Sequence, residues 1–139
     1  MPERPNGTVT RLKRRQSVAP HGAFAHTYAR IRIGFPQQRQ LGPGKIALLE
    51  AIGRTGSIAA AGREMGMSYR RAWLLIDAAN KMFKRPLVVV SLGGQHGGGT
   101  QLTDFGRALI AAYQRIEERT RTAIREELAP FESDVVDDE

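Results

Sequence analysis

The residues best suited to chemistry in this chain are two adjacent arginines, Arg70 and Arg71, which follow Ser68 and Tyr69 in the run SYRRAW. An arginine guanidinium can donate two hydrogen bonds to O6 and N7 of one guanine, a contact worth about 1–3 kcal/mol of discrimination between bases. The serine and tyrosine hydroxyls can reach a phosphate or a base. These residues open an apolar-patterned segment, so they would lie at the start of a helix that Ser68 caps. They predict recognition of double-stranded DNA rather than catalysis.

The elements around this run favour the same interpretation. Two apolar-patterned segments, Ser57 to Met65 and Ser68 to Phe83, are joined by a short break at Gly66. Two short helices joined by a turn of a few residues are typical of a helix-turn-helix, whose second helix enters the major groove of DNA.

Other candidate contacts flank this second helix. Thr55, Gly56 and Ser57 would begin the first helix of the motif, where free backbone N–H groups favour a phosphate, although ordinary capping would select the same residue types. Gln95 and His96 lie in the glycine-rich stretch GGQHGGGT, which could approach the minor groove or a phosphate. This stretch lacks the lysine of a phosphate-binding P-loop.

Two further sets of basic residues could contact the DNA backbone. Lys81, with Lys84 and Arg85, follows or ends the second helix of the motif. A basic arm near the N-terminus could follow the duplex and steepen the salt dependence of binding, or could serve only as a solubilising leader; its residues are Arg11, Lys13, Arg14 and Arg15.

The remaining pattern predicts a mainly α fold with a small β-sheet. We expect a strand from Tyr28 to Phe35, a connection through QQRQLGPG, and a helix from Lys45 to Thr55. The β-branched run from Leu87 to Leu92 and the segment TQLT would form a two-stranded wing after the helix-turn-helix, and the Tyr28–Phe35 strand could complete a three-stranded sheet.

The second helix of the motif carries an apolar stripe, which we expect to be core. Its residues are Tyr69, Ala72, Trp73, Ile76, Ala79 and Phe83. Trp73 would then be the centre of the domain, and Trp73→Ala would cost several kcal/mol of stability. Tyr69 lies at the tip of the stripe, so packing and a phosphate contact are both open for it.

A long final helix begins after its predicted cap, Thr103, and ends at Pro130. About 25 residues at 1.5 Å per residue exceed what so small a core can cover. We expect the far half, roughly Tyr113 to Leu128, to pack against the same helix of a second copy, which makes it a dimerisation helix.

Charge divides the chain into parts. Residues 1–40 carry a net charge of +7, residues 41–100 carry +5, and residues 101–139 carry −5. We predict a flexible basic arm over residues 1–27, a winged helix-turn-helix with its dimerisation helix over residues 28–129, and an acidic tail over residues 130–139. Basic surfaces attract the phosphate backbone or an anionic membrane.

Several classes of protein are disfavoured. The chain has no cysteine, which excludes disulfides and Cys-based metal sites and fits a cytoplasmic location. No apolar run approaches the length of a membrane span, and a transit-type leader is the only targeting alternative. The three histidines have no i, i+4 partner and no catalytic motif occurs, so we expect neither an enzyme nor a cofactor.

The segment LGPGKIALLEAIGRTGSIAAAGREMGMSYRRAW, the Leu87–Leu92 strand, the glycine-rich loop and LTDFGRALI together resemble the N-terminal DNA-binding domain of the molybdate-responsive regulator (ModE) family. That domain is similar to the winged helix of LysR-type regulators. The resemblance implies a winged helix-turn-helix that dimerises through its first and last helices, binds a palindromic operator and regulates transcription.

Full-length members of that family carry C-terminal oxyanion-binding domains, whereas this chain ends about a dozen residues after the long helix. We therefore expect a stand-alone DNA-binding member that does not bind molybdate by itself. The main alternative is a winged-helix module for protein interaction or assembly, which would more often expose apolar residues on its second helix. A small-anion sensor at the dimer interface is a third possibility, for which the sequence identifies no site.

Overall fold

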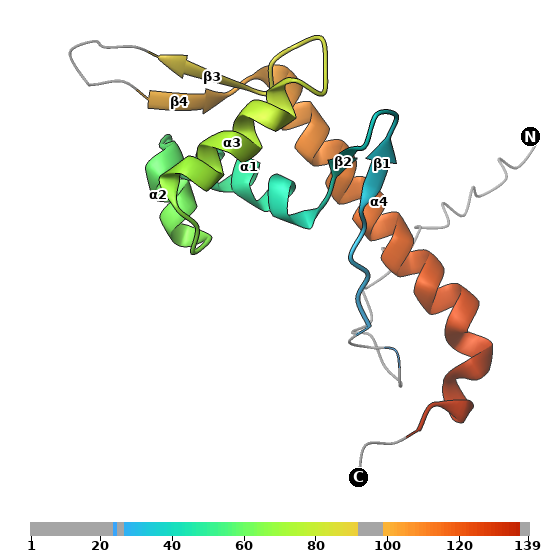
Figure 1. The fold of residues 1–139 in the computed structure, drawn as a ribbon. Helices are drawn as coiled ribbons and strands as arrows, with labels where there is room; N and C mark the ends of the chain where they lie inside the picture. Colours follow the sequence, from blue (N-terminus) through green and yellow to red (C-terminus); the bar gives the residue numbers. More distant parts are fainter. Residues whose placement is uncertain (1–23, 25–26, 92–98, 137–139) are drawn as a thin grey trace, which may run out of the picture.

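The computed structural model describes residue 24, residues 27–91 and residues 99–136. The elements in chain order are β1 (Ile33–Phe35), β2 (Arg39–Leu41), α1 (Pro43–Thr55), α2 (Ile58–Glu64), α3 (Tyr69–Asn80), β3 (Val88–Ser91), β4 (Gly99–Leu102), α4 (Asp104–Leu128) and a 3-10 turn (Ala129–Asp134). Helices α1 to α3 gather at one end of the long α4, and the β3–β4 hairpin projects from the same end (Figure 1). The fold is a mainly α winged helix-turn-helix followed by a long helix, as predicted.

Serine and threonine side chains cap three of the four α-helices. The Oγ of Ser57 accepts a hydrogen bond from Ala60 N at 3.1 Å, and the Oγ of Ser68 accepts one from Arg71 N at 3.2 Å. Thr103 does the same at the start of α4. Each hydroxyl satisfies one of the N–H groups that the first turn of a helix leaves unpaired. These three predicted caps are confirmed.

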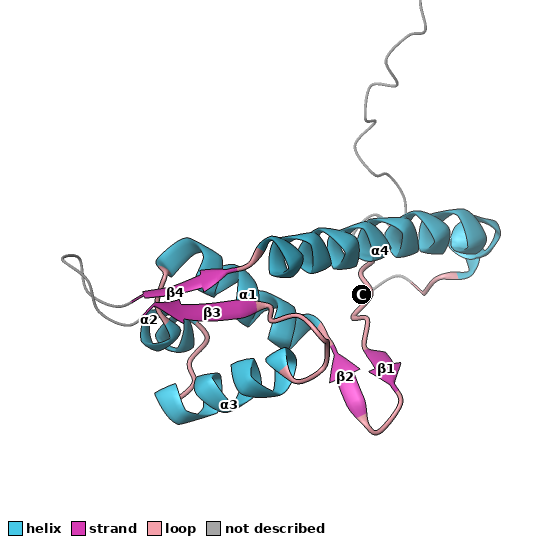
Figure 2. Ribbon diagram, turned by 90° about the horizontal axis from the view of Figure 1, so that it is seen from above, coloured by secondary structure: helices cyan, strands magenta, loops and turns pink. Residues whose placement is uncertain are grey.

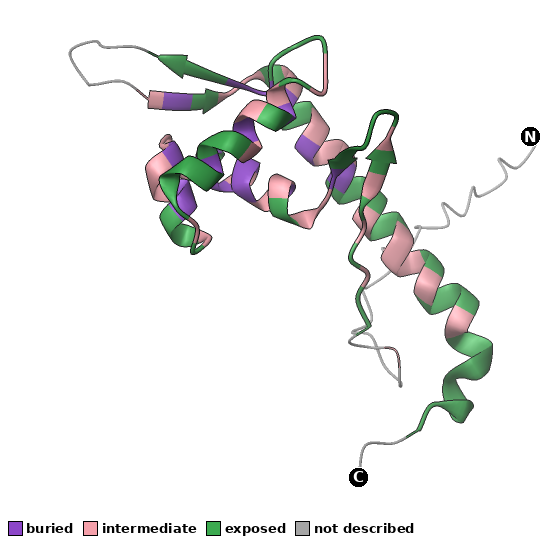
Figure 3. Cartoon of the chain, in the orientation of Figure 1, coloured by how far each residue is buried: buried purple, intermediate pink, exposed green. Residues whose placement is uncertain are grey.

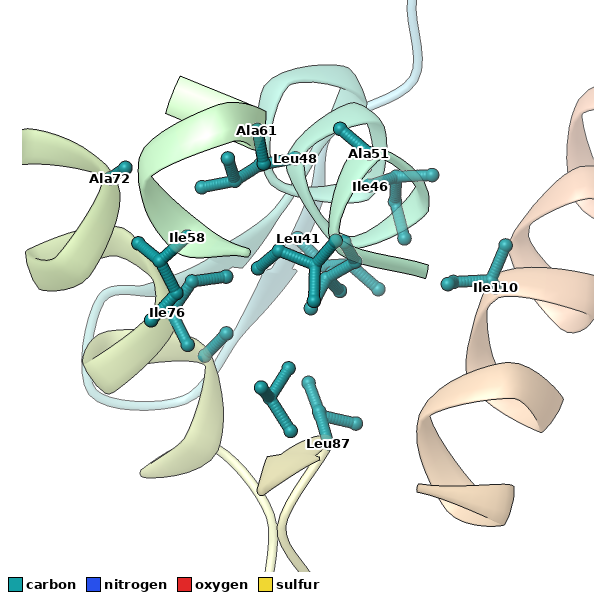
Figure 4. Packing of buried hydrophobic residues seen from close by; sticks show 14 of the residues in the cluster. Leu41, Ile46, Leu48, Ala51, Ile58, Ala61, Ala72, Ile76, Leu87 and Ile110 are labelled. Atoms are coloured by element: carbon teal, nitrogen blue, oxygen red, sulfur yellow. The ribbon is translucent and has the colours of Figure 1, made fainter. Parts of the chain in front are cut away.

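The core lies between α1, α2 and α3 and is closed by Leu87 and by the first half of α4 (Figure 4). Leu48 and Leu49 of α1 are fully buried. Helices α2 and α3 cross closely, because a Cβ placed on Gly62 would lie 3.2 Å from the Cβ of Ala72. Small residues therefore set this spacing, and they leave little room for a large side chain between the two helices.

The predicted three-stranded sheet is wrong. β1 pairs antiparallel with β2, β3 pairs antiparallel with β4, and the two hairpins form separate two-stranded sheets (Figure 2). β2 forms inside the stretch that was expected to be a connection. The loop from Pro36 to Gln38 folds the chain back with Gln37 and Gln38 in the left-handed region, at φ of 67° and 60°.

Asn80, the last residue of α3, ties the helix to the wing. Its Oδ1 accepts hydrogen bonds from Leu87 N at 2.9 Å and Val88 N at 3.1 Å, and its Nδ2 donates to Val88 O at 3.1 Å. At the other end of the wing, Thr103 Oγ1 donates to Pro86 O at 2.7 Å. The wing is therefore anchored between the end of α3 and the start of α4.

Tyr113 belongs to the core and not to the far half of α4, where it was expected. Only 2 % of it is exposed, and its hydroxyl donates to Ile31 O at 2.6 Å. Burial raises the pKa of this hydroxyl above its ordinary value of 10.0, and Glu117 adds to the rise while Arg30 opposes it. The hydroxyl thus stays a donor and fastens the segment before β1 to α4.

Candidate nucleic-acid interface

The first turn of α3 stands at the surface. Ser68, Tyr69, Arg70 and Arg71 are all exposed, with 59 % of Tyr69 accessible. The helix is held from its other side by a narrow buried face made of Ala72, Ile76 and Ala79. Figure 3 shows that α3 combines exposed and buried faces, and Tyr69 lines a hollow together with Val90 and Ser91 of the wing. These four residues, Ser68 to Arg71, which the sequence predicts to contact DNA, therefore lie together at one accessible helix end.

Trp73 is not the centre of the core, and that prediction is wrong. It is 44 % exposed and lies beside the buried face of α3 rather than on it. Successive helical residues are 100° apart, so Trp73 and Ala72 cannot both face α2. The close crossing at Gly62 selects the small residue. The indole therefore joins the outer surface next to Tyr69.

We predict that Trp73→Ala will destabilise the fold by only about 1 kcal/mol, because nearly half of the residue is already exposed and it lies outside the buried face of α3. Leu48→Ala, at a position with 0 % exposure, should cost about 2–5 kcal/mol. Urea denaturation followed by circular dichroism measures both. Equal losses for the two variants would contradict the surface placement of Trp73.

Two hollows flank the first turn of α3. The first, which we call the wing groove, has a volume of about 330 Å³ and is lined by Gly56, Ser57, Ile58, Ala59, Tyr69, Trp73, Val90, Ser91, Gly99 and Thr100. The second has a volume of about 730 Å³ and includes Arg71 among its lining residues. Tyr69 thus borders one hollow and Arg71 the other, and Arg70 lies between them in the chain.

Thr55, Gly56 and Ser57 form the turn between α1 and α2, at the base of the wing groove. Gly56 adopts a left-handed φ of 67°, and its carbonyl accepts a hydrogen bond from Thr100 N of β4 at 2.9 Å. Thr55 Oγ1 donates to Ala51 O at 2.8 Å. The polar groups of this turn hold the wing against the helices, so capping and wing attachment account for these residue types without a ligand.

The other predicted site residues are not gathered at this helix end. Lys81 follows the last residue of α3, and its Nζ forms an ion pair with Asp77 at 2.7 Å. Gln95 and His96 lie outside the described residues, as does the basic arm with Arg11, Lys13, Arg14 and Arg15.

Sequence reasoning missed three basic residues near Arg71. Arg30, Arg32 and Lys45 line the larger hollow together with it. The sequence does indicate that Arg30 and Arg32 share one face. They alternate with the apolar Ile31, and in an extended chain successive side chains point to opposite sides. We call these four side chains and the hollow they line the basic cradle.

Over residues 27–91 and 99–136, no three His, Cys, Asp or Glu side chains come close enough to hold a metal ion. None of the helices that the structure describes is both long and apolar enough to cross a membrane.

Comparison with known proteins shows what this domain is similar to. Residues 44–107 match the family of bacterial regulatory helix-turn-helix proteins of the lysR type. The chain is 51 % identical over 78 residues to the molybdenum-pterin-binding protein MopB of Rhodobacter capsulatus, a match that covers 56 % of this chain and 29 % of that protein. It is 43 % identical over 96 residues to the molybdenum transport protein ModE of Azotobacter vinelandii, covering 69 % and 36 %.

A third relative is the transcriptional regulator ModE of Haemophilus influenzae, 33 % identical over 106 residues, which cover 74 % of this chain and 42 % of that protein. The crystal structure of a CbnR_DBD–DNA complex is similar with a TM-score of 0.47 and 22 % identity, over 63 % of this chain and 95 % of that one. The chain spans less than half the length of each of the three relatives. Residues 44–107 thus match a helix-turn-helix domain of the lysR type, and the chain is similar to a part of each of these Mop and ModE proteins.

Proposed function

We propose that the protein is a sequence-specific, double-stranded DNA-binding transcriptional regulator that acts as a homodimer on a palindromic operator. The observation that carries this proposal is the exposed first turn of α3, where Tyr69, Arg70 and Arg71 stand outside a helix held by Ala72 and Ile76. A helix presented in this way can insert its N-terminal side chains into the major groove.

The two arginines are free to bind a base. Among the described residues, no ion pair within 4.0 Å involves Arg70 or Arg71. A guanidinium without a carboxylate partner keeps its fork of donors for O6 and N7 of guanine. We assign base reading to these two residues, and phosphate or base contacts to Ser68 and Tyr69.

The wing and the turn at its base would contact the DNA backbone on one side of the recognition helix. We assign phosphate contacts to Gly56 and Ser57, which border the wing groove, and to Thr55, which precedes them at the end of α1. Gln95 and His96 would contact the minor groove or a phosphate from the tip of the wing. Lys81 stands at the far end of a 12-residue helix, about 18 Å from its start, so we assign it only a peripheral backbone contact.

The far half of α4 supports a homodimer. The buried residues of this helix, Gly106, Ile110 and Tyr113, all lie in its first half. Beyond them Ile116 is 40 % exposed, and Ile124 continues the apolar stripe. A second copy of α4 could cover this stripe and place two recognition helices on the two halves of a palindrome.

We predict that Ile116→Glu combined with Ile124→Glu will convert the dimer to a monomer, because two charges would be buried in an apolar contact. Sedimentation velocity at micromolar concentration measures the mass. Thr122→Glu, a charge added nearly opposite Ile124 on the helix, is the control and should remain dimeric. A dimer that survives the double substitution would remove α4 as the interface.

A protein-interaction module is the second candidate, because α3 and the wing expose apolar side chains beside the arginines. Trp73 is 44 % exposed, Leu74 49 % and Val90 60 %. Contact with thymine methyl groups and sugars would use such a surface, and so would a partner protein.

Selection from random duplexes separates the two candidates. Purified protein is incubated with a random pool, and retained fragments are sequenced over several rounds. Enrichment of a palindrome supports the regulator, and recovery of unenriched sequence with only salt-dependent binding favours the interaction module. The link to molybdenum rests on the names of the relatives. We propose that it concerns the controlled genes, and that molybdate does not change the affinity of this chain for the selected duplex.

A further inference from the structure

The basic cradle is a hollow that the proposed DNA contacts leave mostly unused. Its charged groups come from three places: Arg30 and Arg32 from the extended segment before β1, Lys45 from α1, and Arg71 from α3. Its volume of about 730 Å³ falls in the range of ligand sites, about 300–1,000 Å³, and exceeds what a single tetrahedral oxyanion needs.

The charge of the cradle is unbalanced. Its lining includes four cationic side chains and no carboxylate. Within the described part of the chain, the ion pairs below 4.0 Å are formed by other residues. Lys45 Nζ donates only to Gln40 O at 2.7 Å and, more weakly, to Met82 Sδ at 3.9 Å. Four cations converging without a counter-charge repel each other, and an anionic group would relieve that repulsion.

The backbone at the rim adds to this preference. Gly42 caps α1 without a side-chain hydrogen bond, and the first turn of α1 contains no acidic residue. The N–H groups of Gly44 and Lys45 have no intrahelical acceptor at these positions, and both residues line the same hollow. These donors complement the four cations, which carry the argument.

We infer that Arg30, Arg32 and Lys45 of the basic cradle bind phosphates of the DNA backbone just beyond the bases that Arg70 and Arg71 read. This inference rests on the proposed DNA binding, because Arg71 belongs both to the exposed first turn of α3 and to the cradle. A DNA strand whose bases contact Arg70 and Arg71 would bring its next phosphates to Arg30 and Arg32. The cradle and the wing groove then hold the backbone on opposite sides of the recognition helix, and the cradle contributes affinity without base preference.

The test compares Arg30→Gln combined with Arg32→Gln against a matched control, Arg115→Gln combined with Arg119→Gln, two exposed arginines on α4. Affinity for the selected duplex and for an unrelated duplex is measured from 50 to 200 mM salt, with dimer mass checked for every protein. Each lost phosphate contact lowers the slope of log K against log salt by about 0.9, which shrinks the affinity change over that range by about 3.5-fold. The cradle variant should lose one to two contacts equally on both duplexes, and the control none.

The outcomes are distinguishable. If the wild type selects a palindrome but the cradle variant keeps the wild-type slope, the inference fails and the proposed function stands. If the wild type binds no duplex, both fail. A third arm follows the amide resonances of Gly42, Gly44 and Lys45 with inorganic phosphate, with molybdate and with duplex. Amide shifts that appear with the duplex, and with neither free oxyanion, support the inference. Saturation by either free oxyanion at low millimolar concentration would overturn it, because the cradle would then be a small-anion site.

Discussion

Arg70→Ala or Arg71→Ala will weaken binding to the selected duplex by about 1–3 kcal/mol, which is about 5- to 150-fold, and will weaken binding to unrelated duplexes much less. Each substitution removes a two-pronged contact with a guanine edge, which only the correct sequence can offer. Both side chains are exposed in the free protein, so the fold should be unaffected. Fluorescence anisotropy with labelled duplexes measures both affinities at one salt concentration.

Two controls separate base reading from charge. Arg70→Lys keeps the positive charge but lacks the planar fork, so it should preserve binding to unrelated DNA and lose the preference for the selected sequence. Arg115→Ala removes an exposed arginine from α4 and should change neither affinity. Equal losses on every duplex for Arg70→Ala and Arg71→Ala would demote these arginines to phosphate contacts.

Gly106→Ala will destabilise the fold by at least about 3 kcal/mol, the upper end of what overpacking usually costs. A Cβ at this position would lie 2.3 Å from the carbonyl oxygen of Leu87. That oxygen also accepts a hydrogen bond from Thr103 N at 2.9 Å, so the backbone there cannot retreat without breaking the junction between the wing and α4. The wing and α4 would therefore lose their fixed relative orientation.

Two other glycines give a graded comparison. A Cβ on Gly53 would lie 2.8 Å from Cδ1 of Leu102, a side-chain atom that can move, so Gly53→Ala should cost about 1 kcal/mol. Gly44 in α1 has nothing within 4 Å of the added carbon, and Gly44→Ala should stabilise by about 0.4–1 kcal/mol. Urea denaturation of the three variants at one protein concentration gives the order. Equal stability of the Gly106 and Gly44 variants would contradict the close approach of α4 to Leu87.

Features governed by local chemistry could be predicted from the sequence. Ser57, Ser68 and Thr103 were identified as caps because a cap needs only a short polar side chain before an apolar-periodic run. Gly56 could end α1 because glycine readily adopts the left-handed conformation that terminates a helix. These residues fix where each helix begins and ends, so the order of helices and the wing followed.

Features governed by packing between elements could not be predicted from the sequence. The apolar stripe of α3 is broad enough to contain both Ala72 and Trp73, and only the close crossing at Gly62 decides which of them is buried. The β1–β2 hairpin turns on Gln37 and Gln38 at positive φ, a conformation for which glutamine gives no sequence signal.

The basic cradle was missed because its residues come from separate segments. Arg32 and Lys45 are brought to one hollow by the return of the β1–β2 hairpin. Their convergence depends on a turn that the sequence did not reveal.

The fluorescence of Trp73 during titration with the selected duplex tests the central claim most directly. The chain has one tryptophan, which lies on α3 beside Tyr69, so its emission reports on the recognition helix alone. If the start of α3 enters the groove, the emission will change saturably, with a midpoint equal to the affinity measured by anisotropy, and Arg70→Ala will shift both midpoints together. Unchanged emission while the duplex binds would show that another surface of the molecule holds the DNA.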